Sequence, residues 1–429
     1  MNSKVARVYD KLKEIFLSID SSFFKLPDSE FLNSNEADLV FQMFPEYYRI
    51  IRKSFDIDEE EAIRTLKHTF KTLQVYFLIL SDNFESNLTN DKFGCIREEL
   101  KEIADLNPII FPLILLLHDI GRPFNRTWHT IESKNMIYHN SLLDGFDLEE
   151  LEKIIVLIVI EHHLLIGTIF TGESSYLGSI SLWKSIAELE HSLSGESIDI
   201  IFQCLSVFTI IDIWGYDYST IYDHYFDYYT NIRLNLAQIF KEVNYRKDLS
   251  GMKILEEKLA QLDHQNLKWR IACSLRIFQF IDTKPYLTKR FYFRKIEEGL
   301  EQLGMNWKQF ESRLGNYCSR IQFKYTLGIM MILAMNEFKR NPIDKSFKIE
   351  SNIFNFWIEC SKIIYMFLKR NEQQKSPLFY YVFDLPRTWF LQDYYRERIK
   401  KPLLIEKIKK SNFDYNHEIF GYINKIKIK

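Results

Sequence analysis

The chain has 429 residues, of which 46% are apolar and 27% charged, a composition typical of globular proteins that excludes disorder and a collagen-like chain. Its 14 glycines and 10 prolines amount to about half of average usage, and this shortage of turn residues favours long helices over many short strands. The net charge of −2 hides an asymmetry, because residues 1–230 carry 19 basic and 37 acidic side chains, whereas residues 231–429 carry 37 and 21.

Cysteine usage and apolar runs bear on where the protein resides. The five cysteines are odd in number, widely spaced and without a C-x-x-C pair, which favours a reducing cytoplasm. The apolar runs at 113–117 and 154–160 are far shorter than the about 20 residues of a membrane span. The first ten residues also lack the apolar core of a secretory leader. The sequence predicts a cytoplasmic protein with no membrane insertion.

Domain boundaries have to be inferred from charge and pattern, because no repeat, low-complexity tract or Gly/Ser linker interrupts the chain. We predict a helical N-terminal extension at 1–54, a domain that carries the chemistry at 55–230, and a basic, mainly helical domain at 231–429. Apolar side chains at helical spacing in 325–340 and 353–370 support the last assignment. The basic half could meet nucleic acid; the alternative is an ordinary solvated charged surface.

The first predicted helix of the central domain spans residues 59–80 and has two apolar sides. His68 shares one of these sides with Thr72, Val75 and Ile79, so we expect its imidazole to point into a packed interior. The opposite side is formed by six apolar residues at steps of three and four: Ile63, Leu66, Phe70, Leu73, Phe77 and Leu80.

The second predicted helix is short and buried. It begins near Phe111, with Pro112 in its first turn, and carries the doublet His118-Asp119 at its end. Gly121 and the following proline supply the stop.

Two further helices present polar groups from apolar surroundings. One is predicted to start at Asp147, with Glu150 completing a capping box, and to deliver His162 and His163 near its end. The other covers residues 197–213 and places Asp212 inside an apolar run, where a carboxylate is costly to bury unless a partner compensates its charge.

Histidine and aspartate side chains on four core helices call for one common explanation, which a divalent metal provides. Imidazole and carboxylate together suit Zn, Mn, Fe, Co or Ni, and an ion would compensate Asp212. Taken singly, each residue has a structural explanation as a hydrogen-bonded core group. Their coincidence on separate helices favours the metal.

The ordered set His68, His118-Asp119 and Asp212 resembles the signature of the HD superfamily of metal-dependent phosphohydrolases. It is most similar to the HD domain of uridylyltransferase/uridylyl-removing enzymes, in which His-Thr opens the first helix, a His begins the helix after the doublet, and HHLL follows. The resemblance covers roughly residues 55–225. It implies an all-α fold, an HD-domain helical bundle with an additional mainly helical C-terminal domain.

The resemblance also implies the site. The metal ligands would be His68, His118, Asp119, His129, His162, His163 and Asp212, holding one or two divalent ions, with His139 as a competitor for the role of His129. Asp119, Arg122 and His129 are the residues expected to act in catalysis. Two features depart from the relatives: Arg122 stands where many have Lys, and residues 1–55 are too few for a nucleotidyltransferase domain.

The leading functional prediction is hydrolysis of a phosphate ester or anhydride, with a phosphorylated small molecule, a nucleotide or a phosphodiester as substrate. One alternative is an HD-type di-iron oxygenase, which uses the same ligand set with O₂. A second alternative is a non-enzymatic HD sensor or scaffold. Retention of every candidate ligand argues against this non-enzymatic alternative. The sequence does not indicate the oligomeric state.

Overall fold

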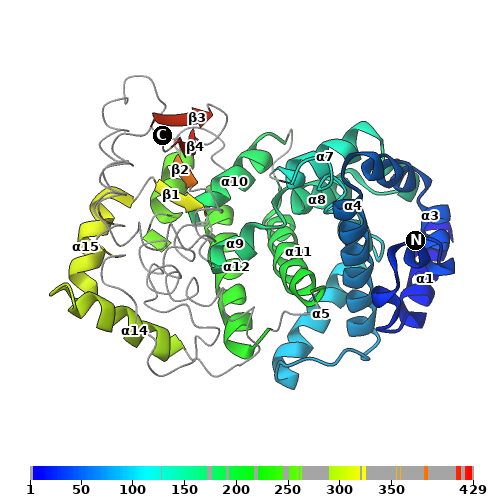
Figure 1. Cartoon of the computed structure of the whole chain (residues 1–429), viewed down its shortest axis with the longest axis horizontal. Coiled ribbons are helices and arrows are strands. Elements are labelled where there is room, and N and C mark those ends of the chain that lie inside the picture. The colour runs from blue at the N-terminus through cyan, green and yellow to red at the C-terminus, as the bar shows by residue number, and fades with distance from the viewer. Residues whose placement is uncertain are drawn as a thin grey trace. The chain divides into compact units, whose positions relative to one another are not determined.

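Helices dominate the computed structural model, and the predicted all-α class is confirmed (Figure 1). The structure describes residues 3–126, 128–171, 176–189, 193–216, 221–244, 251–259, 261–262, 289–318, 321–324, 354, 358, 381–384, 412–416 and 421–427.

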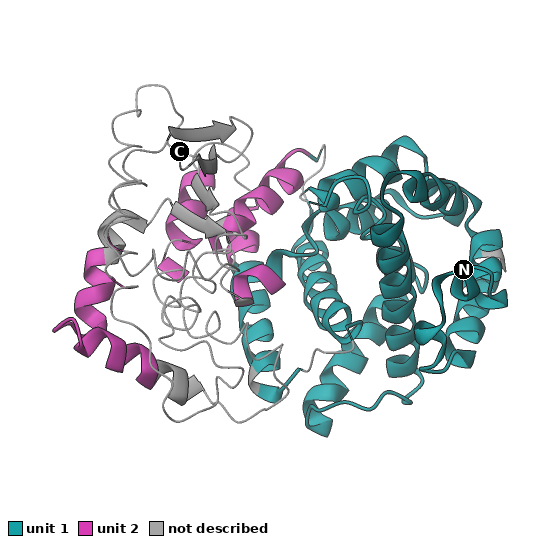
Figure 2. Ribbon diagram, in the orientation of Figure 1, with its two compact units in different colours: residues 1–166, 189–238 teal, residues 167–188, 239–429 magenta. Residues whose placement is uncertain are grey.

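The chain divides into two compact units (Figure 2). The first contains residues 1–166 and 189–238, and the second contains residues 167–188 and 239–429. Compactness alone does not show that a unit folds independently. The domain boundaries at 54/55 and 230/231 therefore stay predictions.

Every described element that lies wholly within the first unit is helical. Residue types at the helix starts explain several boundaries: Ser34 and Ser194 each accept a hydrogen bond from a backbone N–H three residues on, and Pro45 occupies a first turn. The helices are α1 (Ser3–Ser18), α2 (Asp28–Leu32), α3 (Asn35–Met43), α4 (Pro45–Leu80), α5 (Asn90–Leu106), α6 (Ile110–Leu117), α7 (His129–His139), α8 (Glu150–His162) and α11 (Gly195–Trp214), with short 3-10 turns at Phe23–Lys25 and Asp144–Phe146. Two of the three unit boundaries fall within helices, in α9 (Leu165–Thr171) and in α12 (Asp223–Val243).

Helix α4 is two helices joined at Asp58. The backbone of Asp58 is non-helical, and its Oδ1 accepts a hydrogen bond from the backbone N–H of Glu61 at 3.1 Å. Asp58 thus caps the second part of the helix, which ends at Leu80. The helix predicted over residues 59–80 is confirmed.

Helices α6 and α11 form the centre of the first unit. All eight residues of α6 are buried, and the helix packs against α4, α5 and α8. Helix α11 packs against the same three helices. The predicted helices near 111 and over 197–213 are confirmed, although the first already ends at Leu117.

The capping box predicted at Asp147 and Glu150 is wrong. Asp147 has a left-handed backbone, with φ of 53°, and lies outside the helix. The box is formed two residues later by Glu149 and Glu152, so α8 begins at Glu150.

Two helical segments are long and apolar enough to pass a test for membrane spans: Glu150–Phe170 and Gly195–Trp214. Within the apolar windows of these segments, 61% and 72% of the residues are buried inside the protein. Core helices satisfy the same test, so this is weak support for a span. The absence of membrane insertion remains a prediction.

The second unit combines helices with a small sheet. Its helices include α10 (Ile180–Ala187), α14 (Lys289–Glu301) and α15 (Trp307–Cys318), with a 3-10 turn at Tyr176–Ser179. The strands β1 (Ile321–Lys324), β2 (Tyr381–Asp384), β3 (Asn412–Asn416) and β4 (Gly421–Lys427) lie in the order β1-β2-β4-β3. The β1–β2 and β2–β4 pairs are parallel, whereas β3–β4 is antiparallel with an irregularity at Asp414/Tyr415. The helices predicted at 325–340 and 353–370 lie outside the described residues, apart from positions 354 and 358.

Candidate metal centre

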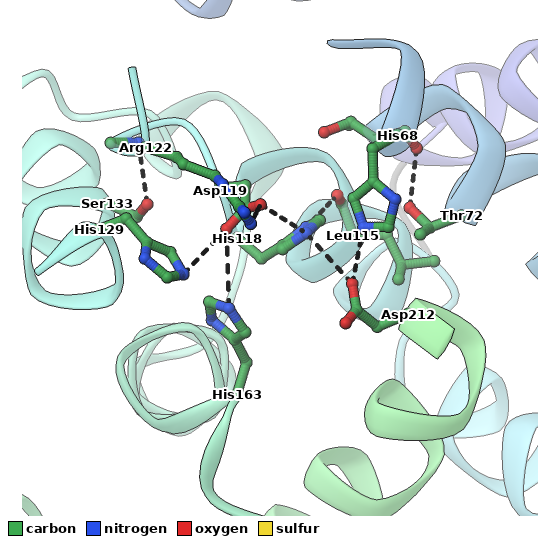
Figure 3. Close-up of polar contacts among 12 residues, drawn as sticks. His68, Thr72, Leu115, His118, Asp119, Arg122, His129, Ser133, His163 and Asp212 are labelled. Atoms are coloured by element: carbon green, nitrogen blue, oxygen red, sulfur yellow. Dashed lines mark hydrogen bonds and ion pairs between the residues drawn. The ribbon is translucent and has the colours of Figure 1, made fainter. Parts of the chain in front are cut away.

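Five segments of the first unit bring their polar side chains to one place (Figure 3). His68 comes from the middle of α4, and the adjacent His118 and Asp119 follow directly after α6. The other three come from helix ends: His129 is the first residue of α7, His163 follows the last residue of α8, and Asp212 lies in the last turn of α11.

The first group consists of His68, His118 and Asp212. The Nε2 atoms of His68 and His118 lie 2.7 and 3.8 Å from Asp212 Oδ1. One ligand atom from each residue lies within 4.8 Å of the others. These three residues can hold a metal ion.

The second group consists of Asp119, His129 and His163, all buried. The Nε2 atoms of His129 and His163 lie 3.3 and 3.7 Å from Asp119 Oδ1. The other carboxylate oxygen, Oδ2, lies 3.7 Å from His118 Nε2. Asp119 therefore faces both groups, one oxygen toward each.

Backbone carbonyls fix the orientation of three imidazoles. The Nδ1 atoms of His118, His129 and His163 each donate to the carbonyl three residues earlier, at 2.8, 3.1 and 2.8 Å. Because a carbonyl oxygen can only accept, the hydrogen lies on Nδ1 and the lone pair on Nε2. The Nε2 atoms of His118 and His129, and Oδ1 of Asp119, are buried without a hydrogen-bond partner. Buried lone pairs that face one another at these distances are unfavourable unless a cation joins them.

The electrostatics favour the forms that bind metal. Burial lowers the pKa of His163 to about 3 and also lowers the pKa of His118, so both imidazoles are neutral near pH 7. Burial alone would raise the pKa of Asp119 and of Asp212, but neighbouring groups outweigh it and keep both pKa values below the usual range. Arg122 contributes a permanent positive charge beside Asp119, whose Oδ2 accepts from Arg122 Nη1 at 2.9 Å.

Two glycines allow the elements of the site to approach closely. A Cβ on Gly215, just after α11, would lie 2.6 Å from Thr72 Cγ2 and 2.9 Å from His68 Cε1. A Cβ on Gly121 would lie 2.5 Å from the backbone nitrogen of Ser133, whose hydroxyl accepts from the Gly121 N–H at 2.9 Å. Glycine at 215 thus seats α11 against His68, and glycine at 121 seats α7 against the loop after Asp119.

Two histidines named in the sequence analysis lie outside both groups. His162 is buried, but its Nε2 lies 3.4 Å from Glu161 Oε2 rather than beside Asp119. His139 is exposed at the end of α7. Of His129 and His139, the structure brings His129 into the site, and of His162 and His163 it brings His163.

The sequence analysis missed Glu61. Its buried carboxylate lies two turns of α4 before His68 and accepts from Arg122 Nε at 2.9 Å. The spacing of Glu61, Thr65, His68 and Thr72 puts four polar residues on one helix face, and this pattern could have revealed it.

Comparisons of the chain with protein-family models, with curated protein sequences and with solved structures gave no match. What the site can do must therefore follow from its own geometry and chemistry. Buried imidazole and carboxylate groups with uncompensated lone pairs fit a divalent metal ion.

Proposed function

We propose that this protein is a metal-dependent phosphohydrolase that cleaves a phosphate ester or anhydride, with a nucleotide or a phosphodiester as the substrate class. The observation that carries the proposal is the set of buried, unpartnered ligand atoms on His118, Asp119 and His129. Their order along the chain, with His68 and Asp212, is the one that resembles the HD superfamily.

The residues divide into two candidate ion sites, and Asp119 faces both. His68, His118 and Asp212 would hold one ion, and Asp119, His129 and His163 the other. When bound, divalent ions supply Lewis-acid chemistry, lowering the pKa of a water molecule and offsetting the charge of phosphoryl oxygens. Zn, Mn, Fe, Co and Ni all suit this mixture of nitrogen and oxygen ligands.

Arg122 supports a phosphorylated substrate over an uncharged one. Its side chain is 26% exposed, and its guanidinium uses Nη1 for Asp119 and Nε for Glu61, which leaves other N–H groups for another acceptor. Guanidinium forks match phosphate oxygens in geometry and charge. Arg122 would hold a phosphoryl group beside Asp119, the carboxylate that faces both ion sites.

The test combines metal analysis with a substrate screen. Protein purified without added metal is analysed for bound metals and then assayed with nucleotides and with bis(p-nitrophenyl) phosphate, before and after chelation. We expect bound divalent metal and phosphate-ester cleavage that chelation abolishes and that the same metal restores. Cleavage that survives exhaustive chelation would contradict the proposal. Iron-loaded protein that consumes O₂ without cleaving phosphate esters would favour the di-iron oxygenase instead.

A further inference from the structure

Glu61 gathers three arginines at the edge of the candidate metal centre. Its Oε1 atom accepts from Arg122 Nε at 2.9 Å and from Arg64 Nη2, and its Oε2 atom lies 3.1 Å from Arg126 Nη2. The Glu61 side chain is 3% exposed. The buried carboxylate holds the three guanidinium groups in place, because leaving its charge unpaired at this position would be costly.

The three arginines reach Glu61 from two elements. Arg64 lies on α4 one turn after Glu61, whereas Arg122 and Arg126 lie in the segment between α6 and α7. The backbone carbonyl of Arg126 also orients His129, whose Nδ1 donates to it at 3.1 Å. The cluster therefore contacts the candidate metal centre at two points: Arg122 donates to Asp119, and the Arg126 backbone carbonyl accepts from His129.

Most guanidinium donors of the cluster remain available. A guanidinium has five N–H groups, and the ion pairs at Glu61, Asp58 and Asp119 use one or two from each arginine. The side chains of Arg64 and Arg126 are 58% and 59% exposed. Donors held in place at one end and exposed at the other are suited to an anionic ligand.

The charge balance also favours an anion. Three arginines face Glu61 and Asp58 within the cluster, and the third carboxylate, Asp119, is the group that faces both candidate ion sites. Since an ion bound at Asp119 would compensate that carboxylate, the cluster then carries a net positive charge. One phosphoryl group at Arg122 does not use the donors of Arg64 and Arg126.

We propose that Arg64 and Arg126, positioned by Glu61, form a subsite for a second phosphoryl group next to the one held by Arg122. This rests on the proposed function and narrows it: the substrate carries two or more linked phosphoryl groups, as in a nucleoside diphosphate or triphosphate. Glu61 is a positioning residue, because it contacts the arginines and not the reacting group.

The test measures binding of inorganic pyrophosphate and of orthophosphate to the metal-loaded full chain by calorimetry. We expect pyrophosphate to bind at least about tenfold more tightly, the factor that one additional charge-assisted contact supplies. Arg126→Gln and Arg64→Gln should each lower the pyrophosphate-to-orthophosphate affinity ratio by about the same factor. Orthophosphate affinity and metal content should stay unchanged.

A matched control is Arg49→Gln, since Arg49 is an exposed arginine of the same unit that pairs with Glu46 and lies outside the cluster. It should leave the ratio unchanged. Glu61→Gln should lower the ratio as much as both arginine variants together, and thermal unfolding shows whether this variant still folds. If it does not fold, the two exposed arginine variants carry the test.

Equal affinity of the wild type for pyrophosphate and orthophosphate would overturn the subsite, as would an unchanged ratio in both arginine variants. These failures leave the proposed function standing if the protein still cleaves a phosphate ester in a metal-dependent way. Conversely, a pyrophosphate preference without any hydrolysis would contradict the proposed function and not the subsite.

Discussion

Asp119 is the residue on which the two halves of the candidate centre depend. Its Oδ1 atom faces His129 and His163, and its Oδ2 atom faces His118 and accepts from Arg122. Asp212, the carboxylate of the first group, contacts the two histidines of its own group, His68 and His118. Loss of the Asp119 charge should therefore affect both ion sites at once.

Asp119→Asn keeps the size of the side chain but removes the charge that holds a divalent ion. We expect bound metal and phosphate-ester cleavage to fall together, each by more than about tenfold, since even the outer partners of metal ligands are worth that much. Elemental analysis and the cleavage assay measure the two effects. Asp105→Asn, at an exposed position of α5, is the control. Normal metal content in a folded Asp119→Asn protein would show that the ion binds elsewhere.

Two cysteines of the first unit should differ in reactivity. Cys95 is exposed, whereas Cys204 is buried in α11 and burial raises its pKa to about 12. A raised thiol pKa means less thiolate at a given pH, so Cys204 should stay unreactive until the pH approaches that value or the protein unfolds. Alkylation of the native protein near pH 8, read out by peptide mass spectrometry, should modify Cys204 at least about a hundredfold more slowly than Cys95. Comparable native rates would mean that α11 is not a stable core helix, and equal labelling in denaturant is the control.

At the scale of elements, the sequence allowed the helices around the site to be predicted because their apolar residues recur at helical spacing. This holds for residues 59–80 and 197–213, where the pattern and the ends of the helices agree with the structure. The predicted start of α8 is wrong because two overlapping pairs, Asp147 with Glu150 and Glu149 with Glu152, have the spacing of a capping box. The left-handed backbone of Asp147, which decides between them, leaves no mark on the residue pattern.

Other features depend on contacts between distant segments, which periodicity does not encode. Neighbouring residues on a helix point about 100° apart, so the packing of α8 decides that His163 and not His162 meets Asp119. Glu61 follows a run of acidic residues, a pattern typical of a solvated helix face, and two of the arginines that pair with it lie about 60 residues away in the sequence. The strands β1 and β2 likewise pair across a long separation in sequence.

The contact of α11 with α4 gives a prediction at this scale. Gly215→Ala would place a methyl group 2.9 Å from His68 Cε1 and 2.6 Å from Thr72 Cγ2, so His68 should shift away from Asp212. Overpacking of this kind costs about 1–3 kcal/mol in the free energy of unfolding. Bound metal should fall by up to one ion per chain, because the second group, around His129, should keep its ion.

Gly94→Ala is the matched control for this change. Nothing lies within 4 Å of a Cβ at position 94, which is inside α5, so this substitution should stabilise the protein by about 0.5–1 kcal/mol. Denaturant unfolding and elemental analysis measure both variants. A Gly215→Ala protein as stable and as rich in metal as Gly94→Ala would show that α11 does not press on His68.

At the scale of the whole molecule, the candidate centre joins segments that are distant in sequence but belong to one compact unit. Its ligands come from α4, from the residues after α6, from α7, from the end of α8 and from α11. In the unfolded chain these side chains are far apart, so an ion that requires several of them binds the folded unit. Binding to the folded state alone stabilises it by mass action.

Divalent metal should therefore protect the first unit, which holds all the candidate ligands, against unfolding. At a free ion concentration about a hundred times the dissociation constant, the stabilisation is about 2.7 kcal/mol, which slows hydrogen exchange through unfolding about a hundredfold. Exchange is measured by mass spectrometry with and without metal. Peptides from α4, α7 and α11 should gain protection together, and peptides from residues 289–318 show whether the second unit unfolds with the first. Asp119→Asn removes one candidate ligand, so it should abolish the gain in all three helices. Protection that persists in this variant would mean that the ion acts somewhere other than at Asp119.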